Sequence, residues 1–201
     1  MALVRAQRRR WNTVVSILAV AAFLVAFGDA AKAGLVTNGG FELGGTGFPT
    51  CSLSGWTPSG NIIHTGVSSD GSQHSGSCYA YIGASLPTTG YIYQDLATAV
   101  GASYDITLWL RTGNDELPTA GEVDWGGVKV WSVSNWAITD WTLFTIPVAA
   151  TSTQTTLTLG FSDTPSYFYL DDIDVNSSVP EPSTFLVGLP ALALLILRRW
   201  K

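Results

Sequence analysis

The sequence YDITLWLR, from Tyr104 to Arg111, decides the fold class of this chain. Apolar side chains alternate along it with polar or amphipathic ones, which is the pattern of a β-strand with one buried side and one side in solvent. We expect the core side to carry Tyr104, Ile106, Leu108 and Leu110, and the outer side to carry Asp105, Thr107, Trp109 and Arg111. The stretch therefore predicts a half-buried strand of a β protein.

The same period of two continues through residues 34–178. Thr155–Ser162 repeats it, with Leu157, Leu159 and Phe161 expected inward and Thr156, Thr158 and Ser162 expected outward. Other strands are predicted at Leu35–Phe41, Gly90–Leu96, Val123–Val133, Trp141–Val148 and Tyr167–Val175. Turn-forming clusters such as Pro58–Asn61 separate these segments. Seven or eight short strands at this spacing predict an all-β, antiparallel two-sheet sandwich.

Residues 1–33 have the three parts of a secretory signal peptide. Arg5 and Arg8–Arg10 are basic, Val14–Phe27 is apolar, and Ala31–Ala33 offers small residues to signal peptidase. We expect a signal helix that is removed, so that the mature chain begins near Gly34. An uncleaved N-terminal anchor is the alternative.

Residues 179–201 read VPEPST, then FLVGLPALALLIL, then RRWK. The apolar run Phe185–Leu197 would extend about 20 Å as a helix, against about 30 Å for the hydrocarbon core of a bilayer. The basic end marks a cytoplasmic side. A short C-terminal hydrophobic helix that anchors the chain transiently is expected, with an ordinary buried helix as the alternative.

The motif Val179, Pro180, Glu181 and Pro182, followed by an apolar segment and an arginine-rich end, resembles the PEP-CTERM sorting domain. The resemblance covers about a tenth of the chain. It implies processing by an exosortase in a Gram-negative bacterium that makes extracellular polysaccharide. The protein would be held transiently at the inner membrane and then delivered to the cell envelope, the cell surface or the extracellular matrix.

The charge of residues 34–178 narrows the range of partners. This segment contains 13 Asp and Glu residues, and its only basic residues are Arg111 and Lys129. So acidic a surface repels phosphate backbones, which argues against nucleic acid. Cations and neutral polymers such as polysaccharides fit it better.

The two cysteines of the chain, Cys51 and Cys78, both lie in the predicted domain. An oxidising compartment outside the cytoplasm allows them to pair. Two free buried thiols are the alternative. Neither cysteine has the spacing of a zinc or redox motif, so a structural role is expected.

A second resemblance covers nearly all of residues 34–178. Its motifs are Asn38–Glu42, Gly55–Thr57, Gln94–Leu96, Gly101–Tyr104 and Tyr169–Ile173. These are similar to the galactose-binding-like jelly roll of many carbohydrate-binding modules, and the resemblance implies a jelly-roll sandwich. In that fold the first and last strands are neighbours, which would bring Glu42 towards Asp171 and Asp172. Three carboxylates there could hold a structural calcium ion. The alternative is that they accept hydrogen bonds from backbone amides of a loop.

Aromatic residues on solvent-facing strand positions suit the binding of sugar rings. Tyr91, Tyr93 and Trp109 are the candidates for stacking, and Asp105, Thr107 and Arg111 are the candidates for hydrogen bonds to hydroxyl groups. The alternative is that these rings pack against each other or lie under a loop. The remaining tryptophans of residues 34–178 are expected to pack in the core or loops: Trp56, Trp125, Trp131, Trp136 and Trp141.

No catalytic motif stands out in the sequence. His64 and His74 are expected to be solvated loop residues, and no nucleophile elbow or zinc-protease motif is present. We therefore expect no enzyme. The predicted function is non-catalytic glycan binding or adhesion, associated with exopolysaccharide or biofilm. The alternatives are a purely structural matrix protein and, less favoured, a polysaccharide hydrolase.

Overall fold

The computed structural model describes residues 34–44, 51–163 and 165–178. The predicted signal peptide (1–33) and the predicted sorting segment (179–201), with Val179 to Pro182, lie outside these residues. Within the described part, all regular secondary structure is β-strand. No helix in that part is long and apolar enough to cross a bilayer.

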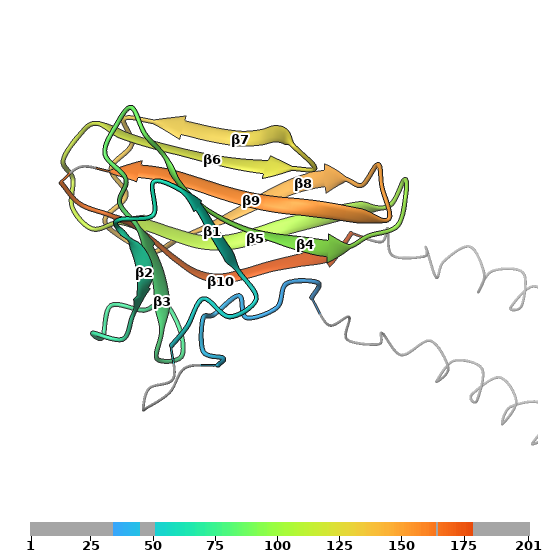
Figure 1. Ribbon diagram of the computed structural model, residues 1–201, viewed down its shortest axis with the longest axis horizontal. Coiled ribbons are helices and arrows are strands. Elements are labelled where there is room, and N and C mark those ends of the chain that lie inside the picture. The colour runs from blue at the N-terminus through green and yellow to red at the C-terminus, as the bar shows by residue number, and fades with distance from the viewer. Residues whose placement is uncertain (1–33, 45–50, 164, 179–201) are drawn as a thin grey trace, which may run out of the picture. The chain divides into compact units, whose positions relative to one another are not determined.

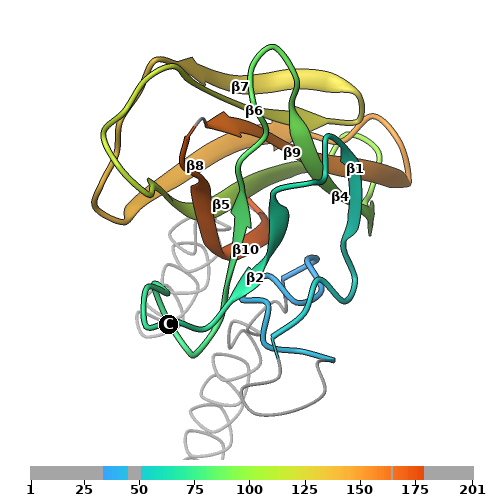
Figure 2. The same cartoon turned by 60° about the vertical axis from the view of Figure 1, so that its left-hand side comes forward.

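Ten strands form two five-stranded sheets, which pack as two layers (Figures 1 and 2). Sheet A contains, in spatial order, β1 (Thr57–Gly60), β4 (Gly90–Ala97), β9 (Gln154–Asp163), β6 (Thr119–Trp125) and β7 (Val128–Ser134). Sheet B contains β2 (Thr65–Ser68), β3 (Tyr79–Ile82), β10 (Phe168–Ser177), β5 (Ser103–Thr112) and β8 (Thr142–Ala149). Every pair of neighbouring strands is antiparallel. The all-β two-sheet sandwich is confirmed.

The core lies between the sheets and is built by alternating residues of both. Strand β5 buries Tyr104, Ile106, Leu108 and Leu110, and β9 buries Leu157, Leu159 and Phe161. These residues belong to one apolar cluster, as the period of two predicted. The prediction that Ser162 faces outward is wrong. Ser162 is buried, and its hydroxyl donates a hydrogen bond to the Thr88 carbonyl oxygen at 2.7 Å, which makes its burial possible.

Residues 35–41 do not form the predicted strand. The segment runs beside β10 (blue in Figure 1), and two backbone hydrogen bonds join them: Leu35 N–H to the Val175 oxygen at 2.9 Å, and Ile173 N–H to the Gly39 oxygen at 3.1 Å. Asn38 and Phe41 have positive φ angles of 58° and 61°, which interrupt the extended conformation. The expected neighbourhood of the first and last segments is present without a strand.

Val123–Val133, predicted as one strand, is a hairpin of β6 and β7. Gly126 and Gly127 form its turn, with φ angles of 60° and 80°. Positive φ at both central residues is typical of the tight hairpin turn whose twist matches the strands. Three further strands, β1, β2 and β3, were not predicted, since they have four residues each and are too short for a clear alternation. The turn predicted at Pro58–Asn61 is wrong, because Pro58 to Gly60 belong to β1.

Cys51 and Cys78 form the expected disulfide bond. It joins the segment before β1 to the residue that precedes β3. The two cysteines are 27 positions apart in the sequence. Closing a loop of this length reduces the entropy of the unfolded chain, which corresponds to roughly 3 to 4 kcal/mol of stability.

Candidate functional site

The outer face of sheet A presents two rows of side chains that cross its strands. The strand register places Ser59, Tyr91, Gly160, Glu122 and Ser132 in the first row. It places Thr57, Tyr93, Thr158, Asp124 and Lys129 in the second row. The residues between them along β4 and β6, such as Ile92 and Val123, are buried in the core. Each row therefore combines a tyrosine on β4 with an acid on β6.

Gly160 has no side chain, which allows the Tyr91 side chain to cross β9 and reach Glu122. A Cβ atom at this position would overlap ring atoms of Tyr91, so the ring lies directly against the glycine. The Tyr91 hydroxyl then donates a hydrogen bond to Glu122 Oε1 at 2.9 Å. Lys129 forms an ion pair with Glu122 Oε2. Tyr91, Glu122 and Lys129 thus hold each other in place on three different strands.

The two acids of this face have opposite pKa shifts. Burial by itself would raise the pKa of Glu122, but hydrogen bonds from Lys129 and Tyr91 outweigh it and lower that pKa. Burial raises the pKa of Asp124, and the nearby charge of Glu122 raises it further. Glu122 is therefore a fixed anion, whereas Asp124 takes up a proton more readily.

Asp124 leaves an acceptor without a partner in the second row. Its Oδ1 atom is buried and accepts no hydrogen bond from the described residues. Tyr93 lies in the same row, two strands away, and is partly exposed. Unpaired burial of an acceptor is unfavourable, and protonation of Asp124, whose pKa burial raises, reduces this cost.

The structure does not bring all the predicted glycan-binding residues together. Tyr91 and Tyr93 lie on the outer face of sheet A, whereas Trp109, Arg111 and Asp105 are on β5 in sheet B. The two outer faces point in opposite directions, since the core lies between the sheets. One flat ligand therefore cannot contact both sets.

The predicted residues on sheet B are partly covered or engaged. Trp109 stacks on the His74 ring, with centroids 3.7 Å apart and planes 18° apart. The Arg111 guanidinium lies over the rings of Trp141 (5.4 Å) and Tyr169 (4.7 Å). A loop thus covers Trp109, which is the alternative that the sequence analysis left open. Tyr91, Tyr93 and Trp109 are all partly exposed, but of these three only Trp109 has another ring stacked on it among the described residues.

Glu42, Asp171 and Asp172 gather beside Gly40, as the resemblance implied. A Cβ at Gly40 would lie 3.7 Å from Asp172 Oδ1, 3.8 Å from Asp171 Oδ1 and 3.8 Å from Glu42 Cγ. Their oxygens accept hydrogen bonds from the loop before β3. Asp171 Oδ2 accepts from the amides of His74 (2.9 Å) and Ser75 (3.1 Å), and Glu42 Oε1 accepts from those of Ser77 (2.6 Å) and Cys78 (2.9 Å).

The oxygen atoms of these carboxylates are placed to accept hydrogen bonds from the loop before β3, and they are less well placed to bind a calcium ion. Both oxygens of Asp171 and both of Asp172 already have hydrogen-bond partners in the chain. Among the described residues, no group of three or more His, Cys, Asp or Glu is arranged to hold a metal ion. Calcium binding here stays a prediction.

His74 is not the solvated loop residue that the sequence predicted. Its Nδ1 lies 2.7 Å from Asp172 Oδ2, and its ring stacks on Trp109. His64 is exposed and makes an edge contact with the Tyr167 ring at 6.1 Å. Of the tryptophans expected to pack inside, Trp56 and Trp125 are each 5% exposed and belong to the core.

Sequence reasoning missed Glu122, Asp124 and Lys129 as members of the candidate site. The signal was present in β6, where Gly121, Val123 and Trp125 are buried and alternate with the two acids. Predicting one strand over residues 123–133 hid this pattern. The strand in fact begins at Thr119, so that it includes Glu122, and it ends before the turn at Gly126 and Gly127.

The fold and this outer face define an antiparallel β-sandwich of the architecture found in carbohydrate-binding modules. TmCBM61, solved with β-1,4-galactotriose, matches with a TM-score of 0.54 at 16% identity, over 73% of this chain and 100% of that one. The CBM22-1 xylan-binding domain of Paenibacillus barcinonensis Xyn10C matches with 0.52 at 16%, over 74% and 97%. A CBM4 structure matches with 0.51 at 17%, over 71% and 99%.

At identities this low, the structural similarity shows a shared fold and nothing about the ligand. No protein-family profile matches the sequence, and no curated protein is similar to it. Several of the similar structures are named as carbohydrate-binding modules, and one of these modules was solved together with a GH10 xylanase module. Another similar structure is the enzymatically active domain of a bacteriophage tailspike protein.

Proposed function

We propose that residues 34–178 form a non-catalytic glycan-binding domain, which uses the outer face of sheet A. The observation that carries this proposal is the pairing of Tyr91 and Tyr93 with Glu122 and Asp124 in two adjacent rows. Solved structures with the same fold include modules bound to β-1,4-galactotriose or described as xylan-binding. The domain would act on no bond of its ligand.

The chemistry of this face suits a neutral polysaccharide. Tyrosine rings on a flat sheet offer apolar surface to the faces of sugar rings, and carboxylates accept hydrogen bonds from hydroxyl groups. The Glu122–Lys129 ion pair and the Glu122–Tyr91 hydrogen bond fix the Tyr91 ring before a ligand arrives. Such preorganisation reduces the entropy lost on binding.

Affinity electrophoresis and calorimetry with galactan, xylan and bacterial exopolysaccharides test the proposal. Tyr93→Ala and Asp124→Asn should each weaken binding by about tenfold or more, since each removes a stacking ring or an acceptor. Leu143→Ala is the matched control, because Leu143 is 48% exposed on β8 of the opposite sheet. Loss of binding in Trp109→Ala alone would move the site to sheet B. Absence of retention on any glycan would favour the structural matrix protein instead.

Hydrolysis is the competing outcome of the same experiment. Glu122 and Asp124 are two carboxyl groups with opposite pKa shifts on one face, which is a feature of acid–base pairs. Release of reducing ends from a bound polysaccharide, abolished in Glu122→Gln, would make the protein a glycosidase.

The proposed route of the protein is export and PEP-CTERM sorting to the cell envelope or the extracellular matrix, with exosortase and signal peptidase as processing partners. Mass spectrometry of the protein purified from its cells tests this route. The expected mass corresponds to a chain that begins near Gly34 and ends near Pro182. A mass that includes Lys201 would contradict removal of the sorting segment.

A further inference from the structure

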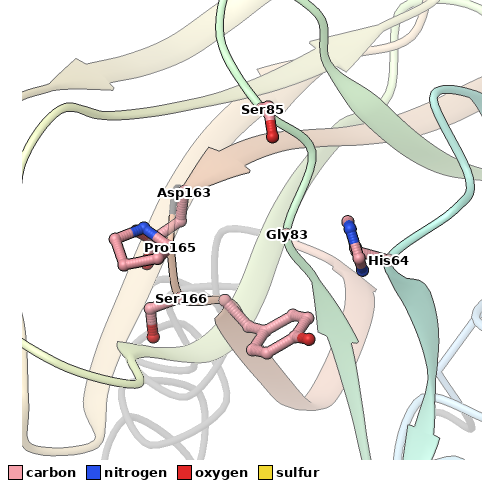
Figure 3. A pocket seen from close by; sticks show the side chains of 7 residues that line it. His64, Gly83, Ser85, Asp163, Pro165 and Ser166 are labelled. Carbon is pink, nitrogen blue, oxygen red and sulfur yellow. The ribbon is translucent and has the colours of Figure 1, made fainter.

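A small pocket lies at one end of the sandwich, away from the outer face of sheet A. It is lined by Gly83 and Ser85, by residues of the β9–β10 connection and by His64 (Figure 3). Ser85 and Tyr167 belong to its wall, and Asp163 ends β9 beside them, whereas the Ser166 hydroxyl lies against Gly113.

Asp163 has an unusual environment for an acid. It is 0% exposed, and neither carboxylate oxygen accepts a hydrogen bond from the described residues. Burial raises its pKa to about 6, and the charge of Glu116 contributes to the shift. A buried carboxylate without a partner is unfavourable by several kcal/mol when ionised, so such groups normally have a counter-charge.

Among residues 34–44, 51–163 and 165–178, no side chain supplies a counter-charge to Asp163. Arg111 and Lys129 are the two basic residues of residues 34–178. The Arg111 guanidinium lies over Trp141 and Tyr169, and Lys129 pairs with Glu122. His64 lines the pocket, but the described residues show no ion pair or hydrogen bond between it and Asp163. The described residues therefore leave the charge of Asp163 to be neutralised by a proton or by a cation from solution.

A metal ion is a poor candidate for this charge. Calcium takes six to eight oxygen ligands and favours several carboxylates. Among the described residues, no three His, Cys, Asp or Glu are grouped to hold a metal ion. A primary ammonium group needs only one carboxylate, because it brings three hydrogen-bond donors of its own.

We propose that this pocket binds an amino sugar with a free amine, as part of the glycan that the domain recognises. Asp163 would accept hydrogen bonds from the ammonium group. Ser85 would bind a hydroxyl group of the same sugar, and the Tyr167 ring would lie against it. The inference rests on the proposed glycan-binding function and specifies the sugar class.

Three oligosaccharide series of equal length test the inference by calorimetry. Cello-oligosaccharides, N-acetylglucosamine oligomers and glucosamine oligomers share a β-1,4 backbone and differ at C2, which carries a hydroxyl, an acetamide or an amine. The purified protein should bind the glucosamine series about tenfold more tightly than the other two. Asp163→Asn should abolish this preference and leave the neutral series unchanged.

The control variant is Asp140→Asn, which removes the same charge at an exposed position between β7 and β8. It should keep the preference, which separates Asp163 from the general acidity of the domain. Tyr167→Leu keeps the carboxylate and should weaken glucosamine binding. In the wild type, the preference should rise as Asp163 ionises near pH 6 and fall again at higher pH, where the amine of the sugar loses its proton; His64, Glu116, Tyr167 and Tyr169 are the other titratable groups around it.

The outcomes separate this inference from the proposed function. Equal binding of all three series, or a preference that survives Asp163→Asn, overturns the amino-sugar site while glycan binding stands. Absence of binding in every series and on every polysaccharide overturns the proposed function. A lysine peptide that binds the wild type as tightly as the glucosamine series shows that only the amine is recognised, which overturns the sugar. Stabilisation by calcium that is lost in Asp163→Asn would overturn the ammonium ligand.

Discussion

Asp163 should make the stability of the domain depend on pH in an uncommon direction. Its pKa is about 6 in the folded protein, against 3.8 as its usual value, so the folded state binds the proton more strongly. The stabilising effect of protonation is complete below pH 4 and is lost as the pH rises through 6. The free energy of unfolding should fall by on the order of 3 kcal/mol over this window because of Asp163.

Urea unfolding at several pH values between 4.5 and 7.5 measures this effect. Asp163→Asn should remove the part of the pH dependence that Asp163 causes. The free energy of unfolding of the variant minus that of the wild type should therefore increase between pH 4.5 and pH 7.5. Other acids shift in the opposite direction, as Glu122 does, so the comparison is the difference between the two proteins. A difference that is constant over the pH range would contradict the prediction.

Gly160→Ala should weaken glycan binding although Gly160 has no side chain to offer. The added methyl group would overlap the Tyr91 ring, which must leave its place and lose the hydrogen bond to Glu122. We expect binding to fall by about tenfold and stability by about 1 kcal/mol. Calorimetry and thermal unfolding measure these two quantities. Unchanged affinity would show that the position of the Tyr91 ring is irrelevant.

Single residues were the hardest part of the site to predict from the sequence. Tyr91 and Tyr93 were found because their alternation with Ile92 and Gln94 shows that they face outward. Trp109 follows the same rule, but it lies under His74, a residue 35 positions earlier in the chain. Alternation gives the face of a strand, whereas the cover over that face depends on long-range contacts.

At the level of elements, the loop before β3 depends on the disulfide. Residues 69–77 cover Trp109 and hydrogen-bond to Asp171 and Glu42, and Cys78 fixes the end of this loop to Cys51. The double variant Cys51→Ala, Cys78→Ala should lose roughly 3 to 4 kcal/mol of stability, because its unfolded chain gains entropy.

Urea unfolding of this variant, followed by tryptophan fluorescence, measures the loss. Binding of a neutral glycan to the outer face of sheet A should be unchanged under folding conditions, since no residue of that face contacts the loop through a hydrogen bond that the structure records. Lost binding in a folded variant would instead place the glycan on the sheet B side.

The long strands were predictable, and the short ones were not. β4, β5, β8, β9 and β10 have eight to ten residues, which is enough for a period of two to appear. β1, β2 and β3 have four residues each. Pairing keeps them extended, since β1 pairs with β4, β3 with β10, and β2 with β3. Their identity as strands is a property of the sheet and not of their own sequence.

At the scale of the whole molecule, the predicted calcium site can be tested through thermal stability. The predicted site at Glu42, Asp171 and Asp172 would raise the melting temperature of chelator-treated protein when calcium is added. Burial raises the pKa of Asp171 to about 6, while hydrogen bonds from the loop amides oppose that shift. Calorimetry with the same protein gives the second readout. No heat and no change in melting temperature would remove the site.

The position of β10 has a mechanical consequence. Ser177 ends this strand, whose final residues pair with β5 on one side and with the segment around Leu35 on the other. Tension applied at Ser178 would therefore pull along a strand held on both sides, and would load its hydrogen bonds in shear. Many bonds would have to break together instead of one after another. A domain tethered through this end would resist drag on a captured polymer without being unravelled from its edge.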